Sequence, residues 1–372
     1  MNFSYWEQKS WFTAIDFTVV GSGIVGLSCA LRLHEKFPKA NILVLERGIL
    51  PQGASTKNAG FACFGSISEI LDDLKTHSEA EVVELVRQRI QGLQLLRETL
   101  GDSQIDYQEL GGYELFTDAD TAVYKECLDK VDYINELLYP LFEKNVYEVQ
   151  QNSFGFNGIQ KHLIFNSCEG QLDTGKMMEA LLTKAQTKGI KVLNNCTVKN
   201  FEQSRDVVEV AVNDFEFITK HLCIATNGFA KQLEIPEVQP ARAQVLITKP
   251  IKDLKIRGAF HLDKGYYYFR NIDNRILLGG GRNLDFKAEE TTEMAQTTLV
   301  QTELERLLKE VILPNTPFEI DYSWSGIMGV GHQKKPIVKQ LEPNVYCGVR
   351  LGGMGVAIGS AIGRELAEMV IG

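Results

Sequence analysis

The sequence predicts an α/β fold in which two domains are interleaved along the chain. Near the N-terminus a strand, a helix and a second strand follow one another within about 30 residues, the length of a βαβ unit. Hydrophobic and polar residues alternate in many short segments of the second half, which favours antiparallel strands. After Asn344 the chain returns to a strand, a glycine-rich turn and a helix, so we expect the last segment to rejoin the first domain.

Composition narrows the class of protein. The chain has 372 residues, of which 44% are hydrophobic and 23% charged, so it is long enough for about two domains with buried cores. Its net charge is -9 and it contains no long basic run, which argues against a nucleic acid partner. The 7 cysteines include no C-x-x-C pair, so we expect a cytoplasmic protein without disulfides or a metal site. The apolar stretch 17–33 holds three spaced glycines and ends in charged residues, which argues against a membrane span.

The N-terminal segment predicts a strand, a helix and a second strand. Residues 17–20 form a continuous apolar run and predict a buried strand. A helix is expected over residues 24–36, since Pro38 disfavours its continuation, and residues 42–45 predict the second buried strand.

The next helices carry recognisable caps. Ser78 and Glu81 form a capping box that begins a helix running to Leu100, and Gly101 ends it. The middle of the chain is expected to be irregular until Asp173 caps a further helix that extends to residue 188.

The remaining elements divide between two domains. Strands are expected at residues 190–193, 198–202, 207–212, 215–218, 221–225, 244–247, 266–270, 275–279 and 344–348, and helices at residues 293–311 and 357–370. Because the two domains are interleaved, we expect the first domain to consist of residues 1–77, 159–235 and 325–372. The second domain is expected to consist of residues 78–158 and 236–324.

The turn after the first strand has the pattern of a dinucleotide-binding site. Gly21, Gly23 and Gly26 enclose Ser22, Ile24 and Val25 and open the first helix. The first glycine permits the tight turn, the second lets the backbone approach a pyrophosphate, and the third lets helix and strand pack closely. Glu46 ends the second strand 20 residues later, where a carboxylate accepts hydrogen bonds from a ribose hydroxyl. This arrangement predicts a Rossmann-type domain.

The segment after Glu46 favours FAD over NAD. Arg47 is followed by a loop of small residues from Gly53 to Gly60, where a plain NAD-binding domain would continue with a helix and a strand. Small residues let the backbone lie against a flavin, and Ser55, Thr56 and Asn58 offer hydrogen bonds to phosphate or to the ring edge.

Together these motifs resemble the family of FAD-dependent D-amino-acid oxidases, glycine oxidases and sarcosine oxidases. The resemblance rests on the glycine motif, the 53–60 loop, the strand ending in Ala225-Thr226-Asn227-Gly228, and Gly352-Gly353-Met354-Gly355 before the last helix. It implies a Rossmann-type FAD-binding domain interleaved with an α+β substrate domain built on a large antiparallel or mixed sheet. It also implies that FAD is bound by Gly21, Gly23, Ile24, Val25, Gly26, Glu46, Arg47, Ser55, Thr56, Asn58, Ala59, Gly60, Val198, Thr226, Leu351, Gly353, Met354, Gly355 and Val356.

The same resemblance places the substrate between the flavin and the large sheet. Tyr267 matches the pocket tyrosine of similar oxidases. Met328 stands where amino-acid oxidases of the family carry the arginine that binds the substrate carboxylate, and a thioether cannot replace that charge. Arg350 and Arg282 are the candidates for supplying it, and His332 is the one histidine considered for catalysis.

Non-covalent binding of FAD is expected. Gly326 occupies the place of the cysteine that binds flavin in monomeric sarcosine oxidases, and residues 53–60 contain no histidine. The resulting hypothesis is an enzyme that oxidises the C–N bond of a small amine or N-substituted amino acid by hydride transfer to flavin N5. Oxygen or another acceptor then takes the electrons. Two alternatives stay open: an FAD-dependent dehydrogenase of a hydroxy acid or glycerol phosphate, and a flavin-binding module without turnover.

Overall fold

The predicted first strand forms β1 (Ile15–Val20) at the centre of an eight-stranded sheet in the computed structural model, which describes residues 2–372. Its neighbours on either side, β2 (Ile42–Leu45) and β11 (Phe215–Ile224), are parallel to it. All of β2 is buried, as expected for a central parallel strand covered on both faces. The other strands of this first sheet are β8 (Lys191–Leu193), β9 (Val198–Ser204), β10 (Val207–Val212), β17 (Ile337–Glu342) and β18 (Val345–Val349).

Helix α2 (Ile24–Lys36) has the predicted bounds and packs closely against the C-terminal helix α9 (Gly355–Ile371). A β-carbon at Gly363 would overlap the carbonyl oxygen of Val25, so a glycine is needed where the two helices touch. The last helix of the chain therefore packs on the first βαβ unit, which confirms that the C-terminal segment rejoins the first sheet.

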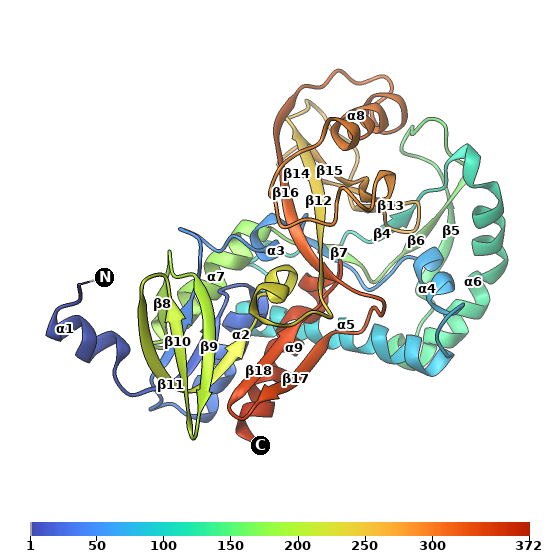
Figure 1. Ribbon diagram of the computed structural model, residues 1–372. Coiled ribbons are helices and arrows are strands. Elements are labelled where there is room, and N and C mark those ends of the chain that lie inside the picture. The colour runs from blue at the N-terminus through green and yellow to red at the C-terminus, as the bar shows by residue number, and fades with distance from the viewer. Residues whose placement is uncertain (1) are drawn as a thin grey trace.

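A second eight-stranded sheet stands beside the first (Figure 1). Phe260 and Phe269 stack in its core with ring centroids 4.6 Å apart, on the side where helix α8 (Thr298–Leu307) packs. Every strand pair is antiparallel except β13–β4, so the sheet is mixed. In spatial order the strands are β16 (Ile320–Val330), β12 (Gln239–Thr248), β15 (Arg275–Gly280), β14 (Tyr267–Ile272), β13 (Ala259–Leu262), β4 (Gly112–Glu114), β6 (His162–Asn166) and β5 (Tyr147–Gln151).

Two long helices follow: α5 runs along the base of the molecule between the two sheets, and α6 packs at the outer edge of the second sheet beside β5 (Figure 1). Helix α5 (Glu79–Leu100) has the predicted capping box, and Gly92 brings it against the backbone of α9 (Figure 1). Helix α6 (Thr121–Phe142) lies where an irregular segment was expected, so that prediction is wrong. The spacing of its buried residues Cys127, Val131, Ile134 and Leu138 is the helical signal that was missed.

Three further elements differ from expectation. Helix α8 begins at Thr298 rather than at residue 293. Strand β6 pairs with β4 and β5, so it belongs to the second sheet although residues 159–235 were assigned to the first domain, and β16 crosses the expected boundary at residue 325. The remaining elements are α1 (Tyr5–Glu7), α3 (Ala54–Lys57), α4 (Ile67–Asp73), α7 (Thr174–Thr187), β3 (Phe61–Ala62) and β7 (Gly170–Gln171). Five short π- or 3-10 helices complete the chain: η1 (Gln8–Phe12), η2 (Asp118–Asp120), η3 (Asn227–Leu233), η4 (Arg282–Leu284) and η5 (Leu308–Ile312). Among residues 2–372, no helix is both long and apolar enough to cross a membrane.

Candidate active site

One cavity is lined by the N-terminal glycine turn, by the loop after β2 and by the segment before α9. It continues to the face of the second sheet formed by β12, β14 and β16. The predicted cofactor residues that line it are Gly21, Gly23, Ile24, Val25, Glu46, Arg47, Ser55, Asn58, Ala59, Val198, Thr226, Leu351, Gly353, Met354, Gly355 and Val356. Segments far apart in the sequence thus meet around one space.

The glycine turn is built as the motif requires. Gly21 has φ +104°, and a β-carbon there would lie 2.8 Å from the carbonyl oxygen of Ala225. A β-carbon at Gly23 would lie 2.7 Å from Ser55 Oγ. That hydroxyl oxygen accepts the Ile24 N–H at 3.0 Å, so Ser55 occupies the start of α2, where phosphate oxygens bind in this type of site.

Glu46 is fixed beside this turn. One carboxylate oxygen accepts the N–H of Ser22 at 3.2 Å and its hydroxyl at 2.8 Å, and the other accepts the Gly48 N–H at 3.0 Å. The carboxylate is therefore held in one orientation at the cavity wall, with lone pairs left to accept ribose hydroxyls.

The end of β11 beside the glycine turn also has the chemistry of a dinucleotide site. The Thr226 hydroxyl is buried without a hydrogen-bond partner among residues 2–372, so it is available to a bound phosphate. Asn227 Oδ1 accepts the N–H groups of Arg350 and Leu351 at 3.1 and 3.2 Å, which fixes the start of the segment before α9. The residues present therefore fit FAD.

Three predicted cofactor residues support the cavity without lining it. Gly26 packs helix α2 on the turn, since its β-carbon would overlap the carbonyl oxygen of Gly21. The Thr56 hydroxyl donates to the carbonyl of Pro51 at 2.6 Å, which stabilises the loop. Gly60 has φ +73° and approaches the backbone of Leu172 too closely for a side chain.

The prediction for Tyr267 needs correction. Its side chain lies in the core of the second sheet with Phe260 and Phe269, and the cavity is lined by Tyr266 and Tyr268 instead. Side chains alternate along β14, so an error of one position moves the residue to the other face. Tyr268 packs over Gly279, which leaves room for the ring on the cavity side.

The other predicted substrate residues all line the cavity. Met328 and His332 lie on it at the end of β16 and in the loop that follows. The guanidinium of Arg282 lies 5.5 Å from the ring centroid of Tyr266. Arg350 also lines the cavity, and its Nε donates to the carbonyl of Lys335 at 2.9 Å. Both candidate arginines thus reach the same space as Met328.

Comparison with known proteins identifies the family to which this chain belongs. A family model described as "FAD dependent oxidoreductase" matches residues 16–369. The chain belongs to this family of FAD-dependent oxidoreductases. It is therefore a flavoenzyme whose cofactor is FAD.

Individual relatives are distant. The chain is 23% identical to "Probable oxidoreductase OrdL" of Haemophilus influenzae, over 96% of this chain and 83% of that protein. Its fold is similar to L-proline dehydrogenase from P. horikoshii, with a TM-score of 0.73 and 19% identity over 96% of this chain and 93% of that one. Glycine oxidase from Geobacillus kaustophilus gives a TM-score of 0.75 and 17% identity, covering 96% and 94% of the two chains.

Helix α4 of the enzyme contributes cavity residues that sequence reasoning missed. Glu69 and Asp72 line the cavity. Asp72 pairs with Lys264 at 3.2 Å, whereas Glu69 has no ion-pair partner among residues 2–372 and accepts only the Ser66 N–H at 3.0 Å. In the sequence Glu69 has the spacing of a helix-capping residue, and nothing in that pattern indicates a cavity.

A second missed group lies deeper in the enzyme. Side-chain atoms of Cys63, Glu169 and His261 lie within 4.8 Å of one another, and all three residues are buried. Burial by itself lowers the pKa of His261, but the charge and hydrogen bond of Glu169, 3.1 Å away, outweigh it and raise that pKa to about 9. The three donor types are also those of a zinc or copper ligand set, although the sequence indicated no metal site.

Proposed function

We propose that the enzyme oxidises the C–N bond of a small amine or N-substituted amino acid. Bound FAD would take a hydride from the carbon that bears the neutral amine, which leaves an iminium cation that hydrolyses in water. Positioning of the substrate by the cavity wall supplies much of the rate acceleration. FAD supplies the electron-accepting chemistry when bound.

The observation that carries this proposal is the unpaired carboxylate of Glu69 in the cavity. A carboxylate without an ion-pair partner stabilises a cation within about 4–6 Å, here the iminium that forms as the hydride leaves. Glu69 lies next to Gly265, since a β-carbon there would be 2.9 Å from its Oε1. It therefore faces the turn that leads into the aromatic floor of Tyr266 and Tyr268. This surrounding favours an amine.

Arg282 is the better candidate for binding a substrate carboxylate. It has no carboxylate partner among residues 2–372 and lies over the ring of Tyr266, whereas Glu69 lies beside the preceding residue, Gly265. Arg350 is tied by its Nε to a backbone carbonyl and lies at the segment before α9. A substrate with both an amine and a carboxylate would thus span from Glu69 to Arg282, while a plain amine would need Glu69 alone.

The two alternatives are less well supported. A glycerol phosphate is a dianion, which the carboxylate of Glu69 would repel, and Lys264 and Lys334 are already paired with Asp72 and Asp73. A flavin-binding module without turnover would not need the tyrosine floor and the charged groups beside it.

Anaerobic bleaching of the flavin by a panel of amines, amino acids and hydroxy acids tests the proposal. We expect bleaching by amines or N-substituted amino acids, and bleaching confined to hydroxy acids would overturn it. Glu69→Gln keeps the acceptor for the Ser66 N–H but removes the charge, so we expect about a tenfold loss in kcat/KM for the best amine. Glu79→Gln on the exposed start of α5 is the control and should have no effect.

A further inference from the structure

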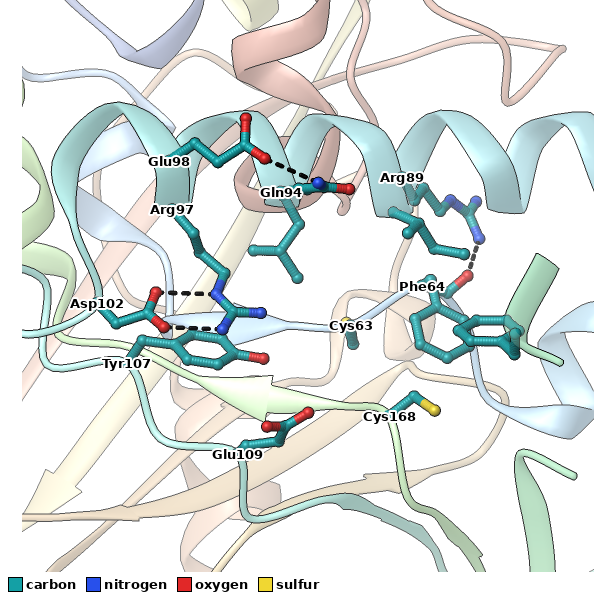
Figure 2. Close-up of a pocket in the computed structure, with 13 residues that line it drawn as sticks. Cys63, Phe64, Arg89, Gln94, Arg97, Glu98, Asp102, Tyr107, Glu109 and Cys168 are labelled. Atoms are coloured by element: carbon teal, nitrogen blue, oxygen red, sulfur yellow. Dashed lines mark hydrogen bonds and ion pairs between the residues drawn. The ribbon is translucent and has the colours of Figure 1, made fainter. Parts of the chain in front are cut away.

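A second cavity of about 570 Å³ adjoins the flavin cavity, which is a volume typical of ligand pockets. It lies between α5, the loop 102–109 and the end of α6. Figure 2 shows α5 crossing above it with Arg89 and Arg97, and Cys63, Glu109 and Cys168 around it. Cys63 and Arg89 line both cavities and so form the wall that the cavities share.

This shared wall touches the segment that approaches the flavin. Cys63 Sγ lies 3.9 Å from Met354 Sδ, and Met354 lines the flavin cavity in the stretch before α9. A ligand in the second cavity would therefore be separated from the cofactor site by about one layer of side chains. It would not occupy the space beside Tyr268 and Met328 where substrate is proposed to bind.

The two ends of the second cavity differ in polarity. Its buried end is apolar and aromatic, with Leu93 and with the rings of Phe64 and Phe142 at a centroid separation of 4.9 Å. Its exposed rim is polar: Gln94 donates to Glu98 at 2.8 Å, and Asp102 accepts both hydrogen bonds from Arg97 (Figure 2). An apolar floor below a polar rim is the usual form of a small-molecule site.

Arg89 is the unusual group at the buried end. It is only 5% exposed, and its Nη1 donates to the carbonyl of Phe64 at 2.6 Å. Among residues 2–372 it has no carboxylate partner, and its Nε is buried without an acceptor. Nη2 is not enclosed in this way and forms no hydrogen bond within residues 2–372, so this end of the guanidinium is available to a ligand in the cavity. The acids at the rim would repel an anion on its way in, so a neutral ligand with a carbonyl oxygen fits best.

We propose that this second cavity binds a quinone, which serves as the electron acceptor of the enzyme. The quinone ring would pack on Phe64, Leu93 and Phe142, and one carbonyl oxygen would accept from Arg89. Reduction of a quinone to a hydroquinone consumes two electrons and two protons, and oxidation of one C–N bond to an imine releases the same number. This proposal rests on the oxidoreductase function above but does not depend on which substrate is oxidised.

Binding is tested with the oxidised holoenzyme and menadione, which do not react with each other. Equilibrium dialysis should give one menadione bound per chain. Leu93→Trp fills the buried end and should raise the dissociation constant for menadione at least tenfold. Ile90→Trp, one turn earlier in α5, should have the same effect and replaces the first variant if that variant does not fold. Leu299→Trp, at an exposed position of α8, is the matched control and should bind as the unmodified enzyme does.

Electron transfer is tested without any amine. Holoenzyme reduced with one equivalent of dithionite is mixed anaerobically with menadione, and the return of the flavin absorbance is followed. We expect reoxidation to slow at least tenfold in Leu93→Trp and not in Leu299→Trp. Reoxidation by menadione in an enzyme that no amine reduces would leave this proposal standing while overturning the proposed C–N chemistry.

Three results would overturn the quinone site. One is the absence of menadione binding to the unmodified enzyme. Another is unchanged binding and reoxidation in both tryptophan variants of α5. The third is loss of binding in Met328→Trp but not in Leu93→Trp, because menadione would then occupy the flavin cavity itself.

Discussion

The ring of Tyr268 lies over Gly279, its partner across the β14–β15 pair. A β-carbon at Gly279 would lie 2.6 Å from Tyr268 Cε2, so the glycine gives the ring its place on the cavity wall. The neighbouring Tyr267 points into the core of the second sheet. Two adjacent tyrosines therefore have opposite surroundings, which makes them a matched pair for mutation.

Removing the Tyr268 hydroxyl should impair the reaction, and removing that of Tyr267 should not. The Tyr268 hydroxyl forms no hydrogen bond within residues 2–372, so it is free to bind substrate. We expect Tyr268→Phe to lower kcat/KM about tenfold, equivalent to one hydrogen bond of about 1.4 kcal/mol. Tyr267→Phe should change it less than twofold. Steady-state kinetics with the best amine compares the two, and equal effects would contradict the placement of Tyr268.

Gly23→Ala should weaken FAD binding. The added methyl group would meet Ser55 Oγ at 2.7 Å and cover the start of α2, where the pyrophosphate is expected. Gly23 has φ -78°, so alanine causes no backbone strain there. We expect the FAD dissociation constant, measured by flavin fluorescence, to rise at least tenfold. Gly175→Ala in the first turn of α7 is the control, because Gly175 does not line the cavity and needs no left-handed backbone.

The stability of the enzyme should fall at alkaline pH because of His261. Its pKa is about 9 in the folded chain and 6.5 ordinarily, so the folded state holds the proton more tightly. The resulting stabilisation is complete below about pH 6.5 and is lost as the pH rises through about 9. We expect the free energy of unfolding to fall by about 2–3 kcal/mol over this range.

Glu169→Gln tests the cause of that pH dependence. The variant leaves His261 without its counter-ion, so the decline between pH 6.5 and 9 should largely disappear. At pH 7 it should be less stable by about 3 kcal/mol, as for a buried pair that loses one partner. Urea unfolding of the holoenzyme at several pH values measures both effects, and a variant with an unchanged slope would refute this assignment.

Asn227→Ala should loosen the segment before α9. Two backbone N–H groups, of Arg350 and Leu351, would lose their acceptor. We expect a loss of about 2 kcal/mol in unfolding free energy together with weaker FAD binding. Asn227→Asp keeps the accepting oxygen and should recover most of the stability. If Asn227→Asp restored neither the unfolding free energy nor FAD binding, Asn227 would not act through these two hydrogen bonds.

FAD should be released when the protein is precipitated with acid. The resemblance to sarcosine oxidases implies that Gly326 replaces their flavin-binding cysteine, so we expect all the yellow colour in the supernatant. The thiol of Cys63 lies in the same cavity, and burial raises its pKa well above the ordinary range, which keeps it protonated and unreactive. Colour retained in the pellet, and released by Cys63→Ser, would contradict this.

The sequence by itself determined the elements whose signals are local. Periodicity and caps gave α2, α5 and β2 nearly to the residue, and the spacing of Gly21, Gly23, Gly26 and Glu46 predicted the dinucleotide site. These predictions are correct because a turn, a helix cap and the conformation of a glycine depend on neighbours within a few residues.

Only the tertiary structure decided the rest. Whether Tyr267 or Tyr268 faces the cavity depends on which face of β14 is covered by α8, and sequence alternation alone gives two equal choices. Glu69, Arg89 and the group of Cys63, Glu169 and His261 come from separate segments, and each has an ordinary role in its own segment. Their meeting is a property of sheet pairing and helix packing, which join residues that no local pattern connects.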